Sequence, residues 1–216
     1  MKKKYTEMIL IILLFSLIVT KDVVTSFTDK TEIINEVYNL NLQNILSDYQ
    51  AILKVNNLKT VNNNYILSKV SYRNINDFWQ YITINKGAKD NVLEKRAVVN
   101  NMGLVGIIDK VDNYSSRVML ITNSKINISV KINNSYGILT AKNNTVYLEN
   151  ITDEVNVKIG DKVYTSGLTE IPENILVGTI KEIKQDDLEL QKIFELTPAV
   201  TIKNIDYVAI LESDSR

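Results

Sequence analysis

The spacing of apolar residues changes twice along the chain and divides it into three segments. Residues 8–19 form an apolar run, interrupted only by Ser16, that lies shortly after three lysines. Residues 28–58 contain neither Gly nor Pro and carry apolar residues at intervals of three and four, which is typical of a helix. From about residue 65 the apolar and polar residues alternate, as in half-buried strands. The pattern predicts a short apolar helix, an amphipathic helix and a β-rich body.

The apolar run is short for a membrane span, which requires roughly 20 residues. A helix can still cross over residues 8–27 if Lys21 extends its amine to the interface and Asp22 lies near the outer surface. We therefore expect an uncleaved, single-pass anchor in the cell membrane. Residues 1–7 would be cytoplasmic and the body would lie on the extracytoplasmic face. A cleaved signal peptide is the alternative, although Val24-Thr25-Ser26 is a weak cleavage site.

Residues 28–64 are interpreted as a membrane-proximal helical stalk. The alternating four-three spacing indicates a coiled-coil seam, and a helix packed on its own domain is the alternative. Asn62-Asn63-Asn64 ends the pattern and provides a hinge. The seam residues are Tyr38, Leu42, Ile45, Tyr49 and Ile52.

The body contains short strand-like segments and no helical pattern between them, which favours small antiparallel barrels or sandwiches over a parallel sheet. Residues 126–132 show the alternation well, with Asn127, Ser129 and Lys131 between apolar neighbours. The other clear segments are 81–84, 118–121 and 207–211. Turns are expected at Lys86-Gly87, Asn100-Asn101, Asn133-Asn134, Asn143-Asn144 and Gly160-Asp161.

Composition restricts the chemistry more than it suggests any. Lys plus Arg and Asp plus Glu are 25 each, so the net charge is zero and no overall basic field attracts nucleic acid. The absence of His and Cys excludes imidazole bases, Ser-His-Asp triads and His- or Cys-ligated metals. With only 7 Gly, we expect Asn to replace Gly where a turn needs positive φ.

The remaining reactive groups are better explained structurally. Ser129 and Lys131 share a solvent-facing strand face, and Asp186, Asp187 and Glu189 lie in a polar loop. Gly103-Leu104-Val105-Gly106 precedes a strand rather than a helix, so it is interpreted as a turn and not as a phosphate loop. Ser166 is expected to cap a turn. We predict no catalytic residue, no cofactor and no metal site, and hence no enzyme.

A series of short motifs runs from Trp79 to Leu211, and their order and spacing are informative as a set. Gly103-Leu104-Val105-Gly106, Ser116-Arg117-Val118 and Thr197-Pro198-Ala199 belong to it. Its most specific part is Gly160-Asp161-Lys162-Val163-Tyr164-Thr165-Ser166-Gly167, followed by Pro172 and Val177-Gly178. In these motifs and their spacing the chain resembles the MreC family of rod shape-determining proteins.

The resemblance implies a mainly β fold, with an anchor helix and a coiled-coil stalk followed by two small antiparallel β-barrel-like domains, here 65–122 and 123–216. The sequence fixes the border between them to within about ten residues. It implies a homodimer, or a higher assembly, that acts as a non-catalytic scaffold for peptidoglycan synthesis during cell elongation. The implied partners are MreD, a class B penicillin-binding transpeptidase and, indirectly, the MreB filament.

The loop that follows the most specific motif is the candidate interaction surface, because loops often carry function. It departs from the family pattern, with Asn174 where the family has glycine, and Asn tolerates the left-handed conformation that a turn needs there. The candidate residues are Ser166, Gly167, Leu168, Pro172, Asn174 and Val177. Two rival functions remain open, an extracytoplasmic adaptor of a secretion system and a tethered cell-wall hydrolase that uses carboxylates.

Overall fold

The computed structural model describes residues 32, 34–47, 49–50, 65–151, 157–185 and 192–211. The expected anchor at residues 8–27 lies outside these ranges. Within them, no helix has both the length and the apolar character needed to cross a membrane. The chain divides into two compact units, residues 1–47 and residues 48–216.

The first unit is helical at residues 34–47. Its large apolar side chains are mostly open to solvent in the single chain. They include Tyr38 (63% exposed), Val37 (58%), Leu46 (56%) and Leu42 (39%).

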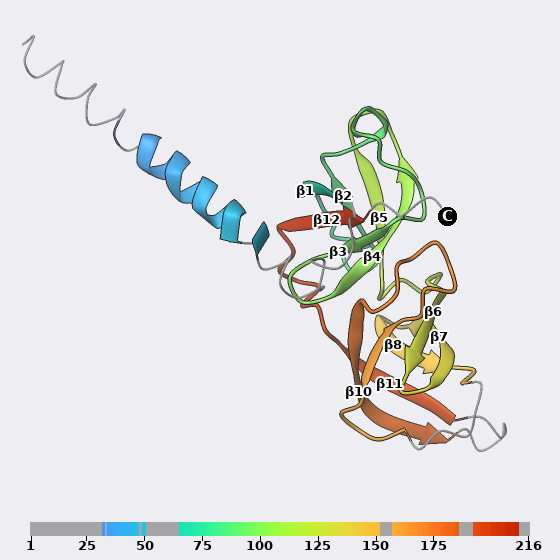
Figure 1. Cartoon of the computed structure of the whole chain (residues 1–216). Coiled ribbons are helices and arrows are strands. Elements are labelled where there is room, and N and C mark those ends of the chain that lie inside the picture. The colour runs from blue at the N-terminus through green and yellow to red at the C-terminus, as the bar shows by residue number, and fades with distance from the viewer. Residues whose placement is uncertain are drawn as a thin grey trace, which may run out of the picture. The chain divides into compact units, whose positions relative to one another are not determined.

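Six strands of the second unit close into a first antiparallel barrel, whose strands Figure 1 labels. Their order around the barrel is β1-β12-β3-β4-β5-β2. The strands are β1 (Tyr65–Tyr72), β2 (Tyr81–Ile84), β3 (Ala97–Val99), β4 (Leu104–Val111), β5 (Ser116–Leu120) and β12 (Tyr207–Leu211). A short 3-10 helix, η2 (Ala88–Asp90), follows β2.

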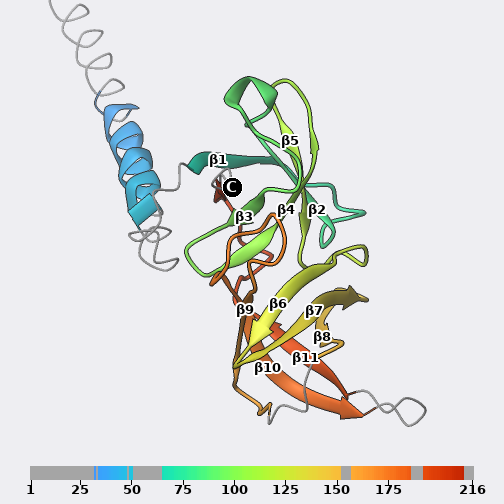
Figure 2. The same ribbon diagram turned by 45° about the vertical axis from the view of Figure 1, so that its right-hand side comes forward.

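Six further strands close into a second antiparallel barrel, in the order β10-β11-β8-β7-β6-β9 (Figure 2). The strands are β6 (Ile128–Ile132), β7 (Ser135–Lys142), β8 (Thr145–Glu149), β9 (Lys162–Thr165), β10 (Leu176–Gln185) and β11 (Lys192–Pro198). The expected mainly β class with two small antiparallel barrels is therefore confirmed.

The last strand corrects the expected division of the body at 65–122 and 123–216. β12 pairs with β1 and with β3, so residues 207–211 belong to the first barrel and not to the second. The first barrel needs a sixth strand between β1 and β3 to close, and the apolar run Val208 to Leu211 is fully buried there. The second barrel is thus an insertion between β5 and β12, and the expected border falls in the connection at 121–127.

The alternating sequence pattern gives each barrel its interior. In β6, Ile128, Val130 and Ile132 are at most 1% exposed, whereas Ser129 and Lys131 between them are half-buried. Complete burial of such a side chain contributes roughly 1.5–3 kcal/mol, so the alternation favours this register strongly over a shift by one residue.

Asparagine replaces glycine at several turns, as the sequence predicted. The backbone φ is 63° at Asn91, 50° at Asn133, 51° at Asn143 and 67° at Asn174. The Asn100-Asn101 turn is built differently, because the Asn100 side-chain oxygen accepts hydrogen bonds from the backbone N–H of Met102 (2.9 Å) and Gly103 (3.2 Å).

Candidate interaction site

The candidate loop joins β9 to β10 and is fixed at its base by Thr165, which is completely buried. The Thr165 hydroxyl donates to the carbonyl of Pro172 (2.6 Å) and accepts from the backbone N–H of Ile175 (3.0 Å). The backbone N–H of Asn174 donates to the Thr165 carbonyl (3.0 Å). Ile171 and Ile175 are buried beneath the loop. These bonds hold both ends of the loop in one conformation.

Ser166 caps the first turn of the loop, as predicted. Its hydroxyl accepts from the backbone N–H of Leu168 (3.2 Å) and donates to the hydroxyl of Ser129 (2.8 Å). Gly167 has φ 74°, and an added Cβ would lie 2.8 Å from the Cβ of Glu173. This position therefore needs glycine for both its conformation and its space.

The six predicted contact residues divide by exposure. Leu168 is 66% exposed and Asn174 is also exposed, while Gly167 and Pro172 are half-buried. Ser166 is 7% exposed, and Val177 is completely buried in the barrel interior. Val177 therefore supports β10 from the core and cannot present its side chain to a partner. The sequence placed it in the loop, but it belongs to the following strand.

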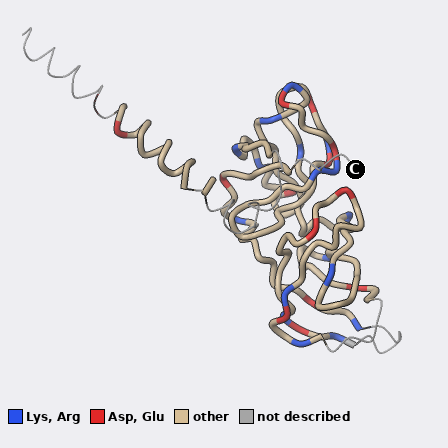
Figure 3. The backbone as a smooth tube through the Cα atoms, viewed as in Figure 1, with Lys and Arg blue, Asp and Glu red and all other residues tan. Residues whose placement is uncertain are grey.

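Charge on and around the loop is balanced. Glu173 pairs with Lys131 (3.2 Å) and Glu170 pairs with Lys95 (3.7 Å), and both glutamates are largely exposed. Such exposed pairs contribute little to stability. Figure 3 shows basic and acidic residues interspersed over the described barrels rather than gathered by sign. The loop thus offers an apolar tip, Leu168, in neutral surroundings.

A more buried charge cluster lies on the outside of the second barrel. Glu195 on β11 is 7% exposed and binds Lys181 (2.6 Å) and Lys184 (2.7 Å). Hydrogen bonds from Lys181 and Lys184 lower the pKa of Glu195, and the same bonds raise the pKa of both lysines. All three groups are held in their charged forms, which suits a structural role better than proton transfer.

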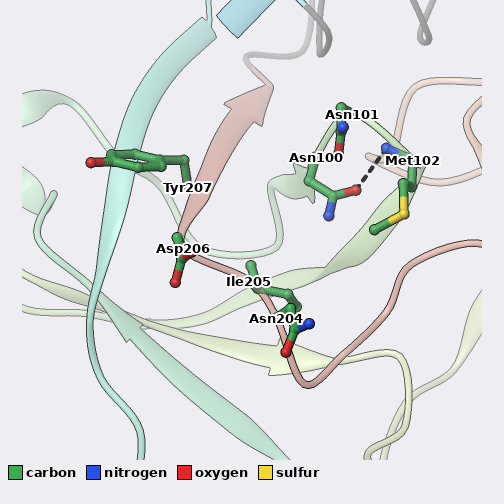
Figure 4. A pocket seen from close by; sticks show the side chains of 7 residues that line it. All are labelled: Asn100, Asn101, Met102, Asn204, Ile205, Asp206 and Tyr207. Carbon is green, nitrogen blue, oxygen red and sulfur yellow. Dashed lines mark hydrogen bonds between the residues drawn. The ribbon is translucent and has the colours of Figure 1, made fainter. Parts of the chain in front are cut away.

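A hollow of about 240 Å³ lies in the first barrel between the β3–β4 turn and the segment that leads into β12 (Figure 4). Its lining is more polar than apolar and comes from Asn100, Asn101, Met102, Asn204, Ile205, Asp206 and Tyr207. Within the described ranges, no group of three or more acidic residues is placed to hold a metal ion.

The predicted seam residues of the stalk are only partly described. Tyr38 and Leu42 are exposed, and Ile45 and Tyr49 are half-buried. The Tyr49 ring lies 5.5 Å from the ring of Tyr65, centroid to centroid. Ile52 lies outside the described residues.

Sequence reasoning missed a second cluster, on the loop between β1 and β2. The guanidinium of Arg73 stacks 4.2 Å from the Phe78 ring centroid and donates to the carbonyl of Lys203 (3.2 Å). Arg73 and Lys203 are 130 residues apart, so no local pattern could have joined them. The aromatic pair Phe78-Trp79 was the available signal, and it is consistent with core packing as well.

The described geometry matches known proteins over most of its length. The family model for the rod shape-determining protein MreC, barrel core, matches residues 70–212. The cell shape-determining protein MreC of Bacillus subtilis is 28% identical over 165 residues, which cover 69% of this chain and 57% of that protein. The match therefore spans little more than half the length of this relative.

Two solved structures extend the comparison. A structure of MreC has a TM-score of 0.71 and 26% identity, covering 80% of this chain and 99% of that one. MreC from Helicobacter pylori, solved in a complex with the penicillin-binding protein PBP2, shares the fold, with a TM-score of 0.57 and 19% identity over 68% of this chain and 98% of that one. The family model covers both barrels, from β1 to β12, and this chain belongs to the MreC family of rod shape-determining proteins.

Proposed function

We propose that this protein maintains cell shape as a non-catalytic scaffold that organises and activates peptidoglycan synthesis during elongation. The observation that carries the proposal is the match of the MreC barrel core to residues 70–212, which takes in every strand of both barrels except the first residues of β1. The absence of His and Cys from the sequence removes the commonest catalytic groups and is consistent with a binding role.

In this proposal the N-terminal third holds the protein at the membrane and pairs two copies of the chain. Residues 8–27 anchor the chain in the cell membrane and residues 28–64 form the stalk of a homodimer, with the body outside the cytoplasm. Exposure of Tyr38 and Leu42 in the single chain supports pairing, because a second helix on this face would bury both side chains.

The partners belong to the wall-synthesis machinery. The complex of the Helicobacter pylori relative with a penicillin-binding protein supports a transpeptidase as a direct partner. MreD and, through the membrane complex, the MreB filament complete the proposed assembly. The rigid loop at residues 166–175 provides one contact surface, with Leu168 as its apolar contact.

The test is depletion of the protein in its native cell, followed by time-lapse measurement of cell width and crosslinking capture of membrane partners. The proposal expects cells that widen or round, and recovery of a transpeptidase with a multi-span membrane protein. The variant Leu168→Ser tests in the same way whether the loop contacts a partner. Ile159→Ser is its control, at another exposed apolar residue of the second barrel.

Unchanged cell width together with recovery of a transporter would overturn the proposal in favour of a secretion adaptor. Turnover of purified peptidoglycan by the chain, abolished by a single Asp or Glu substitution, would overturn it in favour of a hydrolase.

A further inference from the structure

The β1–β2 loop of the first barrel exposes apolar side chains beside Arg73 and Lys203, neither of which forms an ion pair with any described residue. Ile75 is 86% exposed and Tyr72 is 60% exposed, while Arg73 between them is half-buried. We call the set of Tyr72, Arg73, Ile75, Phe78 and Lys203 the Arg73 cluster. A single exposed apolar residue is ordinary, but two that flank an arginine resemble the centre of a protein–protein contact, where Tyr and Arg are enriched.

Arg73 is incompletely satisfied where it lies. Its Nη1 donates to the Lys203 carbonyl at 3.2 Å, but its Nε and Nη2 are buried and have no acceptor among the described residues. Burial lowers the pKa of the guanidinium, since the charged form has lost water and only Nη1 has gained an acceptor. Unmet charged donors are costly, so this conformation stores free energy that a partner with acceptors can release.

The charges around Arg73 favour an anion. Lys203 lies over the Trp79 ring, 5.8 Å from its centroid, and brings a second cation to the cluster. Asp77 lies on the same loop, yet among the described residues neither Arg73 nor Lys203 forms an ion pair with it. A carboxylate can accept two parallel N–H bonds from a guanidinium, which is the geometry that the unused Nε and Nη2 provide.

We propose that the Arg73 cluster is a docking surface for a protein partner that presents a carboxylate beside an apolar side chain. The apolar side chain packs on Tyr72 and Ile75. Arg73 turns outward, exchanging one bond to a carbonyl and the Phe78 stack for two charged bonds to the carboxylate. This deepens the proposed scaffold function and rests on it, by naming one surface and the chemistry that it recognises.

Docking at this loop also reaches both connections between the barrels. Turning Arg73 outward frees the carbonyl of Lys203, which lies in the connection at residues 199–206. At the other end of the loop, Gln80 accepts from the backbone N–H of Ser124 (3.3 Å) and donates to the Thr122 carbonyl (3.4 Å) in the connection at 121–127. A partner at the loop therefore acts on the segments that join the two barrels.

The experiment uses the full chain at native level in its native cell, with a photo-crosslinking benzoylphenylalanine at the exposed position Asn76. Crosslinked peptides are sequenced in the parent and in Arg73→Glu and Ile75→Ser variants. Ile75→Ser keeps the test valid if Arg73→Glu impairs folding, because Ile75 is almost fully exposed.

Two matched controls accompany these variants. Arg117→Gln alters an arginine that also stacks on an aromatic ring, at 4.7 Å from Tyr81, but already pairs with Asp109. Ile159→Ser removes another exposed isoleucine, which is 68% exposed. Neither control should change the crosslink yield.

The expected result is a crosslink to another protein, at a peptide with Asp or Glu next to an apolar residue. Its yield falls at least about tenfold in both variants. Replacing that carboxylate by Arg restores the crosslink to Arg73→Glu. Undiminished yield in the variants, or crosslinks only to lipid or to a second copy of this chain, overturns the docking surface. Cell width and transpeptidase capture in the same strains report the scaffold function separately, so the two failures are distinguishable.

Discussion

Asparagine adopts the positive φ that usually requires glycine at several turns of this chain. Asn174 is the example in the candidate loop. Its backbone has φ 67°, and its N–H donates to the carbonyl of Thr165. Asparagine tolerates this left-handed conformation better than other residues with a Cβ. The sequence predicted the substitution because an Asn stands where the family has glycine.

Replacing Asn174 therefore distinguishes conformation from side-chain chemistry. We expect Asn174→Ala to lower the free energy of unfolding by about 1 kcal/mol and Asn174→Gly to leave it nearly unchanged. Urea unfolding measures both. Asn113→Ala, at an exposed asparagine without positive φ, should be neutral. Equal losses for Ala and Gly at position 174 would show that the side chain matters instead.

Glu195 makes stability depend on pH. Because Lys181 and Lys184 lower its folded-state pKa below the ordinary 4.5, ionised Glu195 stabilises the fold above pH 4.5. That contribution is lost as pH falls from 4.5 through the lowered pKa. We expect Glu195→Gln to reduce the Tm at pH 7 and the difference from the parent to shrink towards pH 3. A difference that stays constant from pH 7 to pH 3 contradicts this account of the cluster.

Elements with strong local patterns were predictable, and elements defined by distant contacts were not. The alternation in residues 126–132 specifies β6, and the turns at Asn133 and Asn143 follow from composition. The place of β12 in the first barrel depends on pairing with β1, more than 130 residues earlier, which no periodicity reveals. The Arg73 cluster was missed for the same reason, whereas the loop after Ser166 was found because its motif is local.

The turn between β3 and β4 illustrates such a distant contact. A Cβ on Gly103 would lie 2.2 Å from the backbone carbonyl oxygen of Leu176, at the start of β10. We expect Gly103→Ala to lower the free energy of unfolding by about 1–3 kcal/mol, because backbone must move to admit the methyl group. Gly160→Ala is the control for conformation alone, because Gly160 also has positive φ (91°) but nothing lies within 4 Å of its added Cβ, so it should cost less than Gly103→Ala. Chemical unfolding of both variants decides whether the close contact sets the cost.

The stalk helix gives a prediction about assembly. If the seam pairs two copies, Leu42→Asp should weaken dimerisation at least about tenfold by placing a carboxylate in the interface. Leu40→Asp makes the same chemical change at a position off the seam that is 54% exposed, so it should weaken dimerisation less. Analytical ultracentrifugation of the detergent-solubilised chain measures both. Equal effects of the two variants would remove the seam from the explanation.

At the scale of the whole molecule, a buried isoleucine in each barrel tests whether the two barrels unfold together or one at a time. Ile210 on β12 is 1% exposed and Ile132 on β6 is 0% exposed. Each substitution by Ala should cost about 2–5 kcal/mol. We expect Ile210→Ala to accelerate amide hydrogen exchange mainly in β1, β3 and β12, and Ile132→Ala mainly in β6, β7 and β9. Exchange that rises equally in both barrels for either variant would mean that they unfold as one unit.

The position of β12 also sets the order in which the protein can be made. A chain that emerges from its N-terminus completes the second barrel once residue 198 is out, while the first barrel still lacks its closing strand. Until residues 207–211 arrive, the edges of β1 and β3 present unpaired backbone groups that can join another nascent chain. The first barrel thus begins earlier in the sequence but closes later than the second. The interval before β12 is made is the step at which newly made chains are most exposed to aggregation.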